Sequence, residues 1–135
     1  MDYVVHAAAL KQVPALEYNP TEAVNTARST GAKKITLLKC VSTYPAEPEE
    51  MNLKAIPHMK ELFNCPVGLS DHSLGIGASV CAVALGANVI EKHFTLSRKL
   101  KTPDSFFSIE PWELKQLVEN VRIAEKVRQG LLWIN

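Results

Sequence analysis

Two histidines in this sequence follow short apolar runs that have the pattern of β-strands. His72 comes two residues after the end of the run 67–70, and His93 closes the run 88–93. If both runs are parallel strands, both histidines lie at carboxyl ends of strands, which is where α/β proteins place their ligand sites. Two imidazoles on nearby strand ends can bind one divalent metal ion and leave coordination positions open for water or substrate. The residues alone leave a second interpretation open, in which each histidine only hydrogen-bonds the loop backbone.

Two carboxylates, Asp71 and Glu91, stand close to these histidines in the sequence, and Ser70 lies at the same rim. Because side chains alternate in direction along a strand, Glu91 and His93 point to one face and Lys92 points to the other. Glu91 is therefore placed to orient a ligand. An ion pair between Glu91 and a lysine inside the sheet is an equally good interpretation, since buried carboxylates are commonly paired. A serine in a loop is usually a turn residue, so Ser70 adds little by itself.

The elements that must position these residues alternate between apolar runs and helical patterns from residue 35 onward. This rhythm is typical of α/β proteins, in which strands separated by helices run parallel and are buried on both faces. The patterns and end signals predict strands over 35–39, 67–70 and 88–93, and helices over 52–63, 78–85 and 111–130. Residues 1–34 depart from the rhythm, with a strand over 3–9, a loop and a helix over 21–30.

Three such units are too few to close a barrel. A (β/α)₈ barrel needs about 250 residues, whereas this chain has 135. If the units belong to such a barrel, the chain therefore holds less than half of it. A small open three-layer sheet is the structural alternative.

Composition narrows the classes of partner. The chain is 47% hydrophobic and 21% charged, as in globular proteins. Fifteen basic and fourteen acidic residues leave a net charge of +1, so we expect neither nucleic acid nor a membrane surface as a partner. The longest apolar stretch, 75–90, contains three glycines and is shorter than the roughly twenty residues of a membrane span. The chain does not open with an export signal, so we expect a cytoplasmic location.

Several segments resemble the sialic acid synthase family, and their order and spacing agree with it over residues 26–129. These segments are 38–45 (LKCVSTYP), 66–76 (PVGLSDHSLGI), 83–87 (VALGA), 90–96 (IEKHFTL) and 103–105 (PDS). The resemblance implies an enzyme that condenses phosphoenolpyruvate with an N-acetylated amino sugar and uses Mn²⁺ or Mg²⁺. It also implies an incomplete (β/α)₈ TIM barrel, of which this chain holds about three C-terminal βα units.

The resemblance implies roles for three residues near the strand ends. His72 and His93 are similar in position to the two metal-binding histidines of the family, and Glu91 to an acidic residue beside the metal. The cation in such enzymes polarises the aldehyde of the open-chain sugar, so that the C3 carbon of phosphoenolpyruvate can attack it. We therefore expect a metal site at the two histidines and a catalytic role for Glu91.

Four further positions are implied to contact substrate. Ser70 matches a residue that contacts phosphoenolpyruvate, and Tyr44 and Asp104 match residues on the amino-sugar side. Some family members have asparagine where this chain has Ser42, so the sugar contact made at that position is expected to differ.

The first 25 residues resemble a different family, the nucleotide-sugar 4,6-dehydratases of the extended short-chain dehydrogenase type. The glycine-rich cofactor turn and the Tyr-x-x-x-Lys pair of that family are both absent from this chain. The sequence therefore predicts a dehydratase-like fragment over 1–25, without dehydratase activity, and the C-terminal part of a synthase barrel over 26–135.

Together these resemblances imply a nonulosonic acid synthase, inactive as an isolated fragment, whose parent enzyme is a homodimer. A pseudaminic acid synthase is favoured, because Phe106 and Phe107 after Asp104 offer apolar contact to a deoxygenated sugar. Three alternatives stay open: an N-acetylneuraminate synthase, a catalytically silent fragment that binds metal or associates, and a dehydratase remnant.

Overall fold

The computed structural model describes residues 20–129 of the chain. The chain divides into two compact units, residues 1–35 and 36–135. The predicted strand over 3–9 lies outside the described residues.

The described part of the first unit contains one helix, α2 (Pro20–Ser29). Its first residue is a proline, whose fixed φ suits the first turn of a helix. After the helix, Gly31 adopts φ +86° and donates its amide to the carbonyl oxygen of Arg28 at 3.0 Å. The helix predicted over 21–30 is confirmed.

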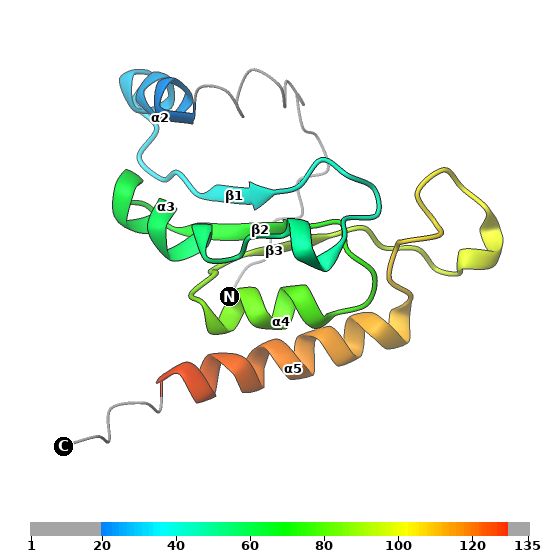
Figure 1. The fold of residues 1–135 in the computed structure, drawn as a ribbon. Coiled ribbons are helices and arrows are strands. Elements are labelled where there is room, and N and C mark those ends of the chain that lie inside the picture. The colour runs from blue at the N-terminus through cyan, green and yellow to red at the C-terminus, as the bar shows by residue number, and fades with distance from the viewer. Residues whose placement is uncertain (1–19, 130–135) are drawn as a thin grey trace. The chain divides into compact units, whose positions relative to one another are not determined.

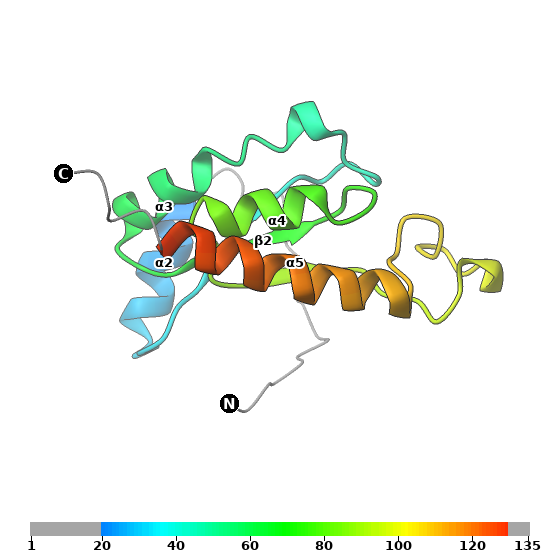
Figure 2. The ribbon, with the colours of Figure 1, turned by 90° about the horizontal axis from the view of Figure 1, so that it is seen from below.

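The second unit is built on a parallel sheet with the strand order β1-β2-β3 (Figure 1). Helices α4 and α5 pack side by side across one face of this sheet, as both views show (Figures 1 and 2). The elements in chain order are β1 (Leu37–Cys40), η1 (Pro48–Glu50), α3 (Ala55–Phe63), β2 (Val67–Asp71), α4 (Gly77–Ala84), β3 (Ile90–Lys92), η2 (Arg98–Leu100) and α5 (Pro111–Gln129). The predicted α/β class with parallel strands is confirmed. Among the described helices, none is both long and apolar enough to cross a bilayer.

The central strand β2 forms the middle of the hydrophobic core, and all five of its residues are buried. Strands β1 and β3 are only partly buried, so the expectation of burial on both faces is right for β2 alone. The reason is that β2 has two neighbouring strands within residues 20–129, whereas β1 and β3 each have one. The buried residues of this core are Ala46, Met51, Ile56, Val67, Leu69, Ala82 and Ala87.

The helix predicted from residue 52 begins later, at Ala55. Asn52 adopts the left-handed conformation with φ +40°, and its carbonyl oxygen accepts the amide of Ala55 at 3.0 Å in a turn before α3. Asparagine is common both as a helix cap and in left-handed turns, so the sequence signal for the two is the same.

The end of α4 is as the sequence predicts. Gly86 adopts φ +104° and donates its amide to the carbonyl oxygen of Val83 at 3.0 Å. Ala87 then donates to the carbonyl oxygen of Ala82 at 2.9 Å, which satisfies the last carbonyl groups of the helix. This cap turns the chain directly into β3, so the last residue of the helix and the start of the strand are close in sequence.

Gly68 allows β2 to lie close to its neighbours on both sides. A Cβ atom at this position would collide with the carbonyl oxygen of Val89 and would lie 2.8 Å from Cδ2 of Leu38. Leu38 is also the residue that pairs with Gly68 across the β1/β2 ladder. The packing of the sheet therefore requires glycine at this position.

A buried ion pair joins the ends of β2 and β3. Lys92 Nζ lies 3.0 Å from Asp71 Oδ2, and the two side chains are 4% and 0% exposed. Burial by itself raises the pKa of Asp71, but hydrogen bonds from Ser73 and Ser79 and the positive charge of Lys92 outweigh burial, so this pKa is lowered. The folded protein therefore holds Asp71 as a carboxylate.

We expect Gly68→Ala to destabilise the fold by about 2 kcal/mol, because the added methyl group must displace backbone or a packed side chain. The matched control is Gly77→Ala at the start of α4, where a Cβ atom would meet nothing within 4 Å. Urea unfolding should show a change within about 0.5 kcal/mol for this control. Equal stabilities of the two variants would contradict the packing argument.

Acid should remove the stabilisation that Asp71 provides. Because the pKa of Asp71 is lower in the folded chain than its ordinary value of 3.8, this contribution is fully present above pH 4 or so and is lost as the pH falls through the folded value. Urea unfolding of the wild type and Asp71→Asn should differ by about 3 kcal/mol near pH 6. The difference should shrink steadily below about pH 4, and a difference independent of pH would count against this account.

Candidate functional site

The candidate site begins at the paired carboxyl ends of β2 and β3. The register places Ser70 opposite Glu91, and Ser70 Oγ donates to Glu91 Oε1 at 2.7 Å. Ser70 is buried and Glu91 is exposed, so a buried hydroxyl group holds one oxygen of an exposed carboxylate in place. The sequence left open whether Glu91 pairs with a lysine; in the structure Lys92 pairs with Asp71 on the other face.

The two histidines follow these strands and face each other. The ring centroids of His72 and His93 are 5.3 Å apart, and the ring planes are inclined by 59°. His72 is 3% exposed, whereas the side chain of His93 is 33% exposed. The predicted convergence of the two histidines at one edge of the sheet is therefore what the structure shows.

A backbone carbonyl group sets the tautomer of His72. His72 Nδ1 lies 2.8 Å from the carbonyl oxygen of Val41, which can only accept a hydrogen bond. Nδ1 therefore carries the proton, and in the neutral ring Nε2 carries the lone pair that a metal ion requires. The sequence could not show that Val41 orients His72, because every residue has a backbone carbonyl group and nothing in the side chain of Val41 marks this one.

Tyr44 covers the two histidines from the loop that follows β1. Its ring centroid lies 4.0 Å from that of His72 and 6.1 Å, edge-on, from that of His93. The loop is tied to the end of β2 because the amide of Ala46 donates to the carbonyl oxygen of His72 at 3.0 Å. Ser42 is exposed in the same loop, two residues before Tyr44.

Asp104 reaches the site from the long loop between β3 and α5. Asp104 Oδ2 lies 3.7 Å from His93 Nδ1, and the side chain of Asp104 is 60% exposed. Asp104 therefore lies beside His93. Its assigned contact with a sugar stays a prediction.

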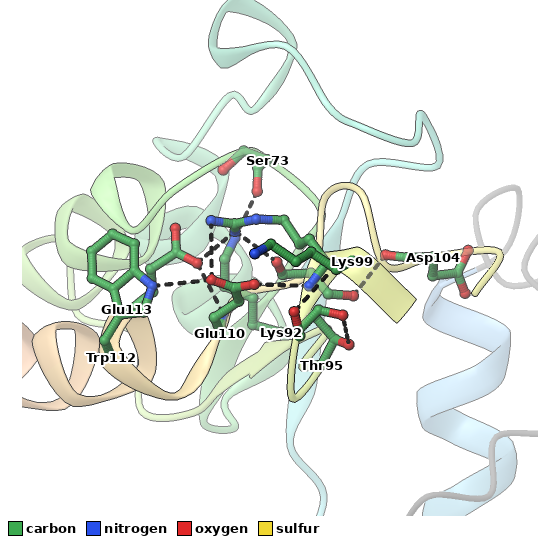
Figure 3. Close-up of polar contacts among 11 residues, drawn as sticks. Ser73, Lys92, Thr95, Lys99, Asp104, Glu110, Trp112 and Glu113 are labelled. Atoms are coloured by element: carbon green, nitrogen blue, oxygen red, sulfur yellow. Dashed lines mark hydrogen bonds and ion pairs between the residues drawn. The ribbon is translucent and has the colours of Figure 1, made fainter. Parts of the chain in front are cut away.

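The base of this loop is fastened to the start of α5. The side chain of Arg98 donates to Glu113 Oε2 and to the carbonyl oxygen of Ser108, while its amide donates to Glu110 Oε1 (Figure 3). The hydrogen bond from the Arg98 amide lowers the pKa of Glu110. Arg98 therefore holds the loop that carries Asp104.

The two phenylalanines after Asp104 have different environments. Phe107 is 3% exposed, and its ring centroid lies 4.9 Å from that of His93 and 5.7 Å from that of Tyr44. Phe106 is 57% exposed beside it. Phe107 therefore packs beneath the histidine and tyrosine rings, and Phe106 is the one that a ligand can reach.

The histidine pair fits a divalent metal ion as two of its ligands. Two imidazoles bound to one cation have ring centres about 5 Å apart, which agrees with the observed 5.3 Å. Across residues 20–129, no three His, Cys, Asp or Glu side chains gather closely enough to hold a metal ion together.

The parallel sheet and its polar edge define an α/β protein with a candidate ligand site at the carboxyl ends of the strands. The sequence model of the NeuB family matches residues 15–131, and the chain belongs to this family. The resemblance to sialic acid synthases is thereby confirmed. The match begins ten residues before the predicted end of the dehydratase-like fragment at residue 25, and the division into 1–25 and 26–135 stays a prediction.

Two curated relatives and one solved structure show how much of the family this chain represents. It is 50% identical over 107 residues to the N,N'-diacetyllegionaminic acid synthase of Campylobacter jejuni, covering 78% of this chain and 32% of that protein. It is 56% identical over 91 residues to the pseudaminic acid synthase of the same species, covering 67% and 26%.

The structural comparison agrees with the sequence comparison. The crystal structure of the N-acetylneuraminic acid synthetase from Leptospira borgpetersenii matches with a TM-score of 0.76 at 35% identity, over 96% of this chain and 43% of that one. The chain thus spans a third or less of the length of the two curated relatives.

We expect Mn²⁺ to bind this chain weakly, with a Kd no tighter than about 0.1 mM, because two neutral ligands leave most of the coordination sphere to water. His72→Ala and His93→Ala should each abolish the binding, measured as loss of the free Mn²⁺ signal in electron paramagnetic resonance. The control is His58→Ala, which removes an exposed histidine of α3. A titration that is unchanged in both site variants would exclude the histidine pair.

Proposed function

We propose that this chain is the C-terminal part of the (β/α)₈ barrel of a nonulosonic acid synthase, which joins phosphoenolpyruvate to an N-acetylated amino sugar. The observation that carries the proposal is the cluster at the carboxyl edge of the sheet. There, the rings of His72, His93 and Tyr44 converge beside the hydrogen-bonded pair of Ser70 and Glu91. This group combines metal ligands, an acceptor for substrate hydroxyl groups and an aromatic wall.

In this proposal His72 and His93 hold Mn²⁺ or Mg²⁺. When bound, the ion supplies a Lewis acid that polarises the aldehyde of the open-chain sugar toward attack by C3 of phosphoenolpyruvate. Glu91, held by Ser70, accepts a hydrogen bond from a substrate hydroxyl group or from water and acts as the catalytic carboxylate. The carbonyl group of Val41 keeps Nδ1 of His72 protonated, so that Nε2 would donate its lone pair to the metal ion.

The amino sugar lies on the open side of the histidines, against Tyr44, Ser42 and Asp104, and Ser70 contacts phosphoenolpyruvate. Pseudaminic acid is the favoured product, because the exposed ring of Phe106 offers apolar contact to a deoxygenated C6 methyl group. The identities to synthases named for pseudaminic and legionaminic acid, 56% and 50%, both support a nonulosonic acid. N-acetylneuraminate is the alternative product.

The isolated chain is proposed to be inactive. It spans a third or less of its curated relatives, so most groups that would position phosphoenolpyruvate lie outside it. Loss of positioning groups costs many powers of ten in rate. The complete enzyme is proposed to be a cytoplasmic homodimer, and residues 1–25 are proposed to be a dehydratase-like fragment without its own chemistry.

One observation supports a second candidate function, that of a silent fragment that associates with other chains. Among the described residues, β1 and β3 each pair with one strand only, so the outer edge of each carries backbone groups available for pairing. The two candidates predict different results when the missing part of the barrel is supplied. The synthase proposal predicts turnover, whereas a fragment that only associates would give none.

The proposal is tested by placing residues 26–129 of this chain in the matching segment of the Leptospira borgpetersenii synthetase, and then assaying two sugars with Mn²⁺. We expect phosphoenolpyruvate consumption by the hybrid and none by the isolated chain. Relative to the parent synthetase, kcat/KM should shift at least tenfold from N-acetylmannosamine toward a 2,4-diacetamido-2,4,6-trideoxy sugar, because one added apolar contact discriminates by about this much.

The matched control for this shift is the same hybrid with Phe106→Ser, which should lose the preference and keep the turnover. A hybrid that folds and stays inactive would contradict the synthase proposal. An unchanged preference for N-acetylmannosamine would contradict only the assignment of the sugar.

A further inference from the structure

A buried ion pair lies on the opposite side of the strands from the residues of the candidate site. Strand β2 pairs with β3 so that Ser70 faces Glu91 in one row and Asp71 faces Lys92 in the next. Successive side chains on a strand point to opposite faces. The row of Asp71 and Lys92 therefore supports the sheet from the face that the candidate site does not use.

The pair ties three pieces of chain together. Asp71 Oδ1 accepts the amide of Ser73 at 2.9 Å and its hydroxyl at 2.6 Å, and Asp71 Oδ2 accepts the hydroxyl of Ser79 at 2.5 Å. Lys92 Nζ forms the ion pair with Asp71. It also donates to the carbonyl oxygen of Ser73 at 2.7 Å (Figure 3). The end of β2, the end of β3 and α4, which carries Ser79, are thus joined through two side chains.

This network fixes the residues next to both histidines in the chain. His72 stands between Asp71 and Ser73, and both of those neighbours are fixed by the network. His93 follows Lys92 directly, so its backbone is fixed on the strand side. The direction of each imidazole ring depends on the backbone at these two positions.

A buried ion pair is a poor device for stability alone. Apolar side chains of similar volume commonly stabilise a protein as well or better, because two charges lose their hydration on burial. What an ion pair with several directed hydrogen bonds does provide is a defined geometry. Asp71 and Lys92 lie where such geometry matters most for the site.

We propose that Asp71 and Lys92 are positioning residues, which hold His72 and His93 at the spacing and ring orientation that one divalent cation requires. Neither residue touches the cation or a substrate in this proposal. The inference rests on the proposed function, because it takes the histidine pair as the metal site.

The test uses the double variant Asp71→Asn/Lys92→Met in the full chain, because removal of both charges leaves neither one buried alone. The matched control is Ile56→Val, which loses one methylene group from a core side chain that is 0% exposed. Mn²⁺ affinity is measured by electron paramagnetic resonance. We expect it to fall about tenfold to hundredfold in the double variant and to stay within about twofold in the control.

A second measurement needs no metal. Long-range ¹H–¹⁵N correlation spectra report which nitrogen of a neutral imidazole carries the proton, and His72 should be protonated on Nδ1 in the wild type and in Ile56→Val. In the double variant we expect a mixture of tautomers, because the ring is no longer aimed at the carbonyl oxygen of Val41. A purely stabilising role of the ion pair would leave this tautomer unchanged.

A loss of Mn²⁺ affinity or a mixed tautomer in the double variant, with the control unaffected, supports the inference. A folded double variant with wild-type Mn²⁺ affinity and the wild-type His72 tautomer overturns it. If the wild type itself does not bind Mn²⁺, the proposed metal site fails, and the tautomer alone decides whether Asp71 and Lys92 position His72.

Discussion

The parallel pairing of β2 with β3 is the constraint on which the rest of the candidate site depends. One register places Ser70 against Glu91 and Asp71 against Lys92. The first row faces the site and carries a hydrogen bond at 2.7 Å, while the second row faces away and carries an ion pair at 3.0 Å. The two histidines continue from the ends of these strands. Site and support are thus separated by the alternation of side chains along the backbone.

Sequence patterns predicted the parts of this arrangement that depend on local signals. The alternation of apolar runs and helical stretches gave the order of the elements, because each run must bury its own residues. Gly86 was correctly predicted to end α4, since a left-handed residue after a helix is usually glycine. The helix predicted from residue 52 begins only at Ala55, because Asn52 adopts a left-handed turn that the same residue type forms as readily as a helix cap.

The contacts that the sequence did not reveal all join residues far apart in the chain. The carbonyl group of Val41 orients His72 across 31 positions, and Arg98 reaches Glu113 across 15. Neither contact can be inferred from the spacing of apolar residues in the sequence, since each depends on how the loops fold back on the sheet. The burial of β1 and β3 was overestimated for a related reason, because burial depends on how many strands stand beside them.

Because the Ser70–Glu91 row and the Asp71–Lys92 row lie on opposite faces of the sheet, an insertion in β3 would disturb both the site and its support. One extra residue within β3 would exchange its faces, because side chains alternate with a period of two. Lys92 would then project toward the face that carries His72, while Glu91 and His93 would turn toward the layer that α4 and α5 cover. Asp71 would lose its counter-charge while remaining buried. Changes of length in this family are therefore expected to collect in the loop beyond residue 95, where the backbone follows no such alternation.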